Sequence, residues 1–149
     1  MSLTPTMAEE VYFSGRLRRL QLPVFTQPTG PDAPSLKRLL LPQGELAQFY
    51  DGEEGVHYIA LLELKAGGVR GNHYHRQKRE YVYVISGKMD LVTENLADRA
   101  QVTLSLSSGE LAIIETEVGH ALRTVEPGLA LEFSPARFDR TDVYRYPLV

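Results

Sequence analysis

The sequence predicts an all-β domain, and three observations lead to this prediction. Short apolar runs separated by turn residues recur along the chain from residue 36. In residues 101–106 polar and apolar side chains alternate, which is the period of two of a half-buried strand. After residue 34 no long segment has a clean helical period. About ten strands at short, regular spacing are typical of a β-sandwich or barrel.

The expected strands follow one another with Gly, Pro, Ser or Asp between them. They are residues 36–41, 45–50, 57–64, 80–85, 89–93, 102–106, 111–115, 121–125 and 129–133. Ser86-Gly87 is expected to make a hairpin turn. The Pro-rich residues 22–34 predict an extended segment, so we expect an N-terminal arm over residues 1–35 and a single barrel domain over residues 36–149. A second methionine, Met7, indicates that the first residues include sequence added to the natural chain.

The strand at residues 80–85 is apolar on both faces. Val82 and Val84 lie on the side of Glu80, while Tyr81 and Tyr83 face the opposite way. Both faces should therefore be covered, either by a second sheet or by the partner in a dimer. We expect a homodimer.

The composition removes several classes of function. The chain has 149 residues, no Cys and a formal net charge of -3. Without thiolates a metal site must use His and carboxylate ligands, and without a basic excess nucleic acid is not an expected partner. No apolar run is long enough to span a bilayer and no secretory signal is evident. We therefore expect a cytoplasmic protein with no membrane partner.

Three of the four histidines fall within or after one pattern. Residues 67–87 contain G-x5-H-x-H-x4-E-x6-G, which includes His73, His75 and Glu80. On a strand His73 and His75 point to the same side, and a turn is expected to bring Glu80 in from the neighbouring strand. The next histidine along the chain, His120, is the candidate fourth ligand. Imidazole and carboxylate ligands suit Zn, Fe, Mn, Ni or Cu.

This pattern resembles the first motif of the cupins, which are small jelly-roll barrels, also described as double-stranded β-helices. Of the second cupin motif the positions of Gly109 and His120 match, whereas Glu115, Glu117 and Thr124 replace its Pro, Gly and Asn. The resemblance implies one divalent transition metal held by His73, His75, Glu80 and His120. Glu115 or Glu117 could assist near the barrel mouth.

A narrower resemblance is carried by residues 70–75, R-G-N-H-Y-H, and by the acidic-aromatic residues 138–146. Both are similar to RmlC-like cupins of sugar-nucleotide and polysaccharide pathways, such as nucleotide-sugar 3,4-ketoisomerases. This resemblance implies a sugar-like ligand in the barrel, with His73 and His75 as catalytic acid and base. Arg70 would face a diphosphate or hydroxyl group.

The resemblances leave three functions open. The first is an isomerase or epimerase acting on a sugar or sugar nucleotide, and the second is a metal-dependent oxygenase acting on a small molecule. The third is a non-catalytic sensor or binding module for a small polar ligand. A histidine that holds a metal cannot also be a free base, so metal binding and histidine catalysis compete for the same side chains.

Overall fold

The structure is a computed structural model that describes residues 5–149. Residues 1–4, which belong to the segment expected to be additional to the natural chain, lie outside the described residues. The predicted all-β class is confirmed. The described elements, in chain order, are β1 (Ala8–Tyr12), the 3-10 helix η1 (Phe13–Gly15), β2 (Leu17–Gln21), β3 (Val24–Phe25), β4 (Lys37–Leu41), β5 (Gly44–Gln48), β6 (Tyr58–Leu64), β7 (Val69–Tyr74), β8 (Glu80–Asn95), β9 (Gln101–Ser107), β10 (Glu110–Ile114), β11 (Val118–Ser134), the 3-10 helix η2 (Arg140–Asp142) and β12 (Tyr144–Arg145).

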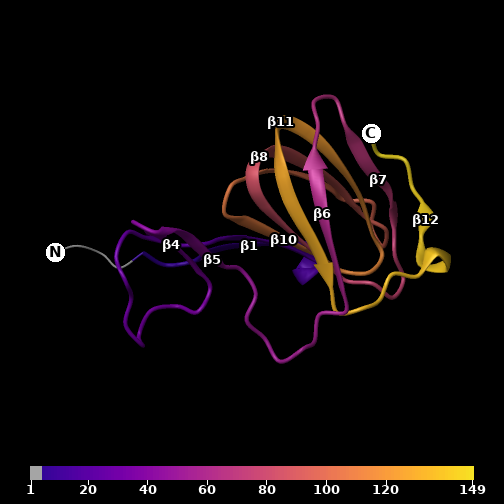
Figure 1. Cartoon of the computed structure of the whole chain (residues 1–149). Helices are drawn as coiled ribbons and strands as arrows, with labels where there is room; N and C mark the ends of the chain where they lie inside the picture. Colours follow the sequence, from indigo (N-terminus) through magenta and orange to yellow (C-terminus); the bar gives the residue numbers. More distant parts are fainter. Residues whose placement is uncertain (1–4) are drawn as a thin grey trace.

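Two long strands, β8 and β11, form the centre of the barrel sheet. They pair antiparallel with each other along their length. The first half of β8 also pairs with β10, and the second half of β11 pairs with β6. The second half of β8 pairs with β9, and the first half of β11 pairs with β7. The curved sheet therefore folds into two facing halves that share β8 and β11 (Figure 1).

The hairpin expected at Ser86-Gly87 is absent, because β8 continues through these residues as a bend. Gly87 has φ +81°, and a Cβ there would lie 2.5 Å from the carbonyl oxygen of Pro127. β11 bends beside it, with register shifts between Glu126 and Ala130. Gly87 thus marks the place where the paired strands β8 and β11 pass from one half of the sheet to the other. Glycine here permits a bend in a continuous strand, whereas in a hairpin it would permit a reversal of the chain.

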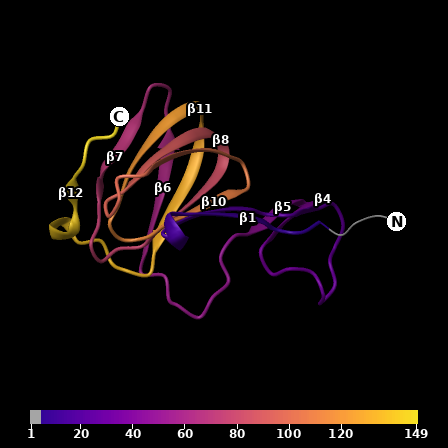
Figure 2. The same ribbon diagram turned by 180° about the vertical axis from the view of Figure 1, so that it is seen from behind.

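Part of the expected N-terminal arm belongs to the main sheet. β2 pairs with β10, and β1 pairs with the other edge of β2. Leu17 and Leu20 of β2 are buried. The small sheet of β3, β4 and β5 extends away from the barrel, on the side opposite to η2 and β12 (Figures 1 and 2).

The main core lies between the two facing halves of the sheet. It contains buried side chains from both halves, among them Val82 and Val84, on the face that also carries Glu80, as expected. Its members are Leu17, Leu62, Leu64, Val82, Val84, Met89, Leu91, Leu104, Leu106, Ala112, Ile114, Val118, Leu122 and Ala130.

A second apolar cluster lies on the outer face of β2, β10, β8 and β11 and includes Tyr81 and Tyr83. Residues of the segment 36–56 cover it, and the ring of Phe49 stacks on that of Tyr83 with centroids 4.2 Å apart. The chain itself therefore covers both faces of this strand, and a dimer is not needed to explain its pattern.

The barrel is open on one side. Among the described strands β6 and β7 follow each other in sequence but have no ladder between them, since β6 pairs with β11 and β7 pairs with β11 and β12. None of the described helices has the length and hydropathy needed to cross a bilayer.

Candidate functional site

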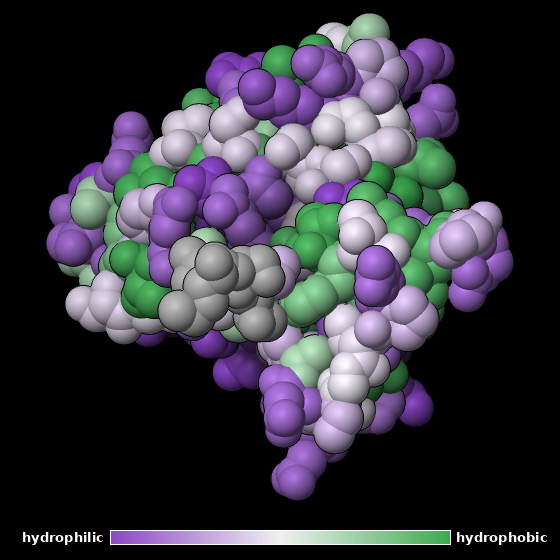
Figure 3. All heavy atoms as spheres, turned by 90° about the vertical axis from the view of Figure 1, so that its left-hand side faces the viewer, coloured by the Kyte–Doolittle hydropathy of each residue, from purple (hydrophilic) through white to green (hydrophobic). Residues whose placement is uncertain are grey.

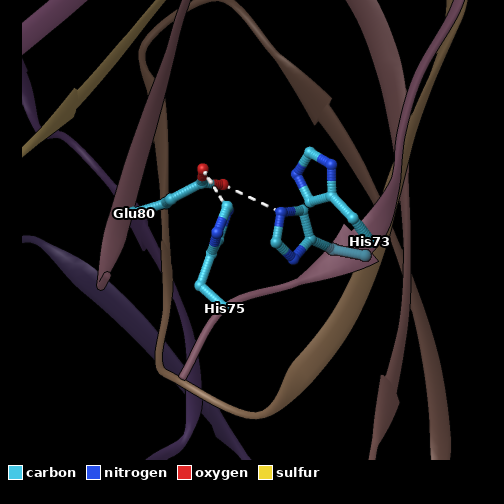
Figure 4. A group of neighbouring side chains, drawn as sticks. His73, His75 and Glu80 are labelled. Atoms are coloured by element: carbon cyan, nitrogen blue, oxygen red, sulfur yellow. Dashed lines mark hydrogen bonds and ion pairs between the residues drawn. The ribbon is translucent and has the colours of Figure 1, made fainter. Parts of the chain in front are cut away.

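The four expected metal ligands come together inside the barrel. His73 lies in β7, His75 follows the end of that strand, Glu80 begins β8 and His120 lies in β11. One potential ligand atom from each lies within 4.8 Å of every other. Figure 4 shows His73, His75 and Glu80 pointing toward one another. The sequence motif therefore marks a real cluster in space.

Close packing of β7 against β11 brings two of the histidines together. His73 is paired with His120 across this ladder, and a bulge follows His120. A Cβ on Gly71 would lie 2.8 Å from the carbonyl oxygen of His120. Glycine at this position of the R-G-N-H-Y-H segment therefore allows the two histidine-bearing backbones to approach.

Glu80 enters the cluster from across the barrel, and the expectation that it comes from the strand next to β7 is wrong. β11 lies between β7 and β8 in the sheet. The carboxylate bridges two histidines, with Oε1 2.9 Å from Nε2 of His75 and Oε2 2.9 Å from Nε2 of His120. All three side chains are buried.

Backbone carbonyls hold the opposite ring nitrogens of these two histidines. Nδ1 of His75 lies 2.6 Å from the carbonyl oxygen of Asp142, and Nδ1 of His120 lies 3.0 Å from that of Val118. A carbonyl can only accept, so each Nδ1 carries hydrogen. A neutral imidazole then presents the Nε2 lone pair to the Glu80 carboxylate, which is unfavourable unless a proton or a cation lies between them.

Burial and neighbouring charges shift the pKa values of the clustered residues in different directions. Burial, supported by the neighbouring charge of His120, lowers the pKa of His73 to about 4. Burial also opposes ionisation of Glu80, but His120 and His75 outweigh it and hold the Glu80 pKa well below its ordinary value. The charge of Glu80 in turn overcomes burial and raises the pKa of His120. The cluster without metal thus favours a carboxylate beside a charged His120 and a neutral His73.

Two further charged side chains, Lys78 and Glu132, were not expected in the site. Nζ of Lys78 lies 3.2 Å from Oε1 of Glu80, 3.0 Å from Oε1 of Glu132 and 4.1 Å from the centre of the Tyr58 ring. Lys78 is 5% exposed. Burial opposes its charge, but the two carboxylates raise the Lys78 pKa, whereas burial and the charge of Glu80 raise the pKa of Glu132.

The sequence held a signal for both residues. Lys78 has the same parity as Glu80, so in an extended chain both face the interior. Glu132 is an ionisable residue within the otherwise apolar run 129–133, where a charge is costly unless it is paired.

A cavity of about 310 Å³ lies over the cluster. Strands β6 and β7 contribute to its walls, as do Phe138 and Val143 of the C-terminal segment. Arg70 lines it and is exposed. Its lining residues are Tyr58, Leu62, Arg70, Gly71, His73, His75, Lys78, Glu80, His120, Leu122, Glu132, Phe138 and Val143.

The structure places other candidate residues away from this cavity. Glu115 and Glu117 are not among the lining residues, and Glu115 forms an ion pair with Arg79. The ring of Tyr74 stacks on that of Tyr144, with ring centroids 5.0 Å apart. Glu115 and Tyr74 thus make structural contacts, and the polar floor of the cavity consists of the histidines, Lys78, Glu80 and Glu132.

Comparison with known proteins gives one family and a set of similar folds. A family model described as the polysaccharide biosynthesis C-terminal domain matches residues 43–128. No curated protein matches the sequence significantly. Many solved structures resemble it.

Among these structures is a 3,4-ketoisomerase from Helicobacter canadensis, with a TM-score of 0.66 and 14% identity over 74% of this chain and 86% of that chain. Another is the dTDP-6-deoxy-D-glucose-3,5-epimerase RmlC from Legionella pneumophila, in complex with dTDP-4-keto-L-rhamnose. Its TM-score is 0.71, with 12% identity over 94% of this chain and 77% of that chain. The capsular polysaccharide assembling protein CapF from Staphylococcus aureus has a TM-score of 0.57 and 20% identity, over 79% of this chain and 34% of that chain. The predicted jelly-roll fold is confirmed.

Proposed function

Because the chain belongs to the family of polysaccharide biosynthesis C-terminal domains and has an RmlC-like cupin fold, we propose that it is a metal-binding isomerase or epimerase acting on a sugar or sugar nucleotide. The observation that carries the proposal is a cluster of three imidazoles, two carboxylates and one ammonium group under a cavity. His73 and Glu132 are half-buried and the other four residues are buried. The cavity volume of about 310 Å³ lies at the lower end of the range for small-molecule sites. It would accommodate a sugar ring, while a nucleotide would extend past the mouth.

The donor set fits a divalent transition metal held by His73, His75, Glu80 and His120. The Nδ1 hydrogens of His75 and His120 are fixed on carbonyl oxygens, as is usual for histidine ligands. Nε2 of His120 is buried beside Glu80 but makes no well-aligned hydrogen bond among the described residues. When bound, the metal would supply Lewis-acid polarisation of a substrate oxygen. The ligand types suit Zn, Fe, Mn, Ni or Cu.

With these four side chains engaged, we assign the handling of protons and charge at the reacting carbon to Glu132 and Lys78, which form an ion pair beside Glu80. A Glu132 oxygen would accept the proton on the carbon next to the substrate ketone, since its raised pKa brings it nearer to working pH. The Lys78 ammonium would stabilise the resulting enediolate oxygen. In an isomerisation, the proton would return to the neighbouring carbon while the hydroxyl proton moves to the former ketone oxygen. In an epimerisation, a donor on the opposite face, such as water, would protonate the same carbon. Neither route requires an oxidant.

Arg70 is placed to bind rather than to react. It lines the mouth of the cavity and is exposed, and a guanidinium group suits the fork of a phosphate or a pair of hydroxyls. This supports a role for Arg70 toward the diphosphate of a sugar nucleotide.

The test combines metal analysis with solvent exchange on protein purified without a metal-affinity column. We expect a stoichiometric divalent metal and incorporation of deuterium from D2O into a keto-sugar nucleotide, lost in Glu132→Gln. If metal-free protein exchanges deuterium and this exchange depends on His73, the result would instead show histidine base catalysis. A redox-active metal with O2 consumption and no exchange would favour an oxygenase, and binding without turnover would favour a sensor.

We also propose that the chain forms a homodimer through the outer face of β6. Ile59 and Leu61 on this edge strand are 68% and 63% exposed, and Leu129 on the neighbouring β11 is 39% exposed. Figure 3 views the molecule from another side, that of β4 and β5, and shows apolar side chains in patches between polar ones there. Leu61→Lys should convert a dimer into a monomer in sedimentation analysis, and a monomeric unmodified protein would contradict the proposal.

Two other expectations stay predictions, namely a cytoplasmic location and the lack of a nucleic-acid partner. The net charge of -3 supports the second of these. Fractionation of cells that produce the full protein would test the first.

A further inference from the structure

The C-terminal segment joins the site through one residue. η2 and β12 run beside β7 (Figure 1), where Tyr144 pairs with Tyr74 and Arg145 with His73. Asp142, at the end of η2, is 7% exposed. Its backbone carbonyl is the group that holds Nδ1 of His75 at 2.6 Å.

The side chain of Asp142 has a second role. Its carboxylate accepts hydrogen bonds from the backbone N–H groups of Arg76 at 2.8 Å and of Gln77 and Lys78 at 3.1 Å each. Among the described residues it forms no ion pair with a cationic side chain. Three consecutive N–H groups that converge on one buried carboxylate form an anion-binding nest, so this carboxylate fixes the conformation of the loop between β7 and β8.

We infer that Asp142 is a positioning residue that aligns His75 and Lys78 in the site. The inference rests on the proposed function, because it concerns the same cavity. Its carbonyl sets which nitrogen of His75 faces Glu80, and its carboxylate places the backbone from which Lys78 reaches Glu80 and Glu132. Both effects depend on a segment that lies far along the chain from the motif.

Other contacts hold this segment against β7. The side-chain oxygen of Asn72 accepts hydrogen bonds from the backbone N–H groups of Leu148 and Val149, and its carbonyl accepts one from Tyr146. The guanidinium carbon of Arg76 lies 4.5 Å from the centre of the Tyr144 ring. Loss of the Asp142 carboxylate should therefore loosen the loop without releasing the whole segment.

The matched variants are Asp142→Asn and Asp139→Asn. The first keeps the size of the side chain but turns an amide NH2 toward backbone donors, so the three N–H groups cannot all be satisfied. Asp139 lies in the same segment and is exposed, and its side chain bonds only to Thr141 among the described residues, a cap that Asn can also form. The Asp139→Asn variant should therefore leave the site unchanged.

Five measurements test the inference. In metal-free protein, Asp142→Asn should increase amide exchange at Arg76, Gln77 and Lys78 at least tenfold, and should alter the ¹⁵N shifts of the His75 ring. It should weaken Co²⁺ binding about 10- to 100-fold, the usual effect of losing a partner of a metal ligand, and change the visible spectrum of the Co²⁺ protein. It should lower kcat more than it changes KM.

The inference is overturned if Asp142→Asn lowers only the unfolding midpoint and keeps wild-type exchange, ring shifts, Co²⁺ affinity and spectrum. If wild-type protein binds no Co²⁺, the metal part of the proposed function fails, while amide exchange and His75 ring shifts still decide the positioning role. If Asp142→Asn does not fold, Asp142→Glu provides the same comparisons with a displaced carboxylate.

Discussion

Nζ of Lys78 lies 3.0 Å from Oε1 of Glu132 inside the cavity, and the same ammonium group also contacts Glu80. Lys78→Met should lower kcat about 100-fold or more, because a charge stabiliser of the enediolate is lost. It should also lower the free energy of unfolding by about 3 kcal/mol, since the buried Glu80 and the half-buried Glu132 lose their shared cation. Enzyme kinetics and urea unfolding measure the two effects.

The control for this prediction is Lys65→Met, which removes an exposed lysine in the turn after β6. It should leave both quantities near the wild-type values. Unchanged kcat in Lys78→Met would contradict a catalytic role for the ammonium group.

Glu80→Gln should remove most of the metal affinity. The amide has the same shape as the carboxylate but no charge, and it leaves the three histidines in place. The affinity loss should exceed the roughly 10- to 100-fold that follows loss of an outer partner. Chelator competition measures it, with Glu63→Gln on the exposed side of β6 as the control. Equal affinities in the two variants would show that the cluster is not the metal site.

Gly87→Ala should destabilise the protein by about 2 to 4 kcal/mol. Residue 87 has a left-handed φ, and a Cβ there would press on the backbone oxygens of Pro127 and Glu126. Gly30→Ala, where nothing lies within 4 Å of the added carbon and φ is not positive, should have little effect. Similar unfolding midpoints for the two variants would show that the paired bend of β8 and β11 tolerates side chains.

Deletion of residues 1–35 should abolish cooperative folding. The deleted segment includes β2, whose Leu17 and Leu20 are buried in the two apolar clusters. Deletion of residues 1–6 alone should retain a cooperative thermal transition, because β1 and β2 remain. A folded protein after the longer deletion would show that residues 36–149 form an independent domain.

The sequence predicted the all-β class and the cluster of potential metal ligands because both depend on local sequence patterns. Alternation reports which face of a strand is buried. The residues of the His-x-His-x4-Glu pattern lie together in the folded protein, even though Glu80 enters from across the barrel. The continuity of β8 and β11 could not be predicted, because Gly87 is compatible with both a turn and a bend. Asp142 was also missed, because its role arises from contacts with residues 75–78 that are distant in sequence.

The pairing of β8 with β11 also affects how the chain reaches its native state. Each half of the sheet contains part of both strands, so neither half can form alone from residues that are close in sequence. Such distant pairings must close long loops before they gain stability, and comparable β proteins fold on a scale of about milliseconds to seconds. The apolar faces of β8, including Tyr81 and Tyr83, remain uncovered during that time. Aggregation during refolding should therefore increase with protein concentration, even under conditions in which the native protein does not aggregate.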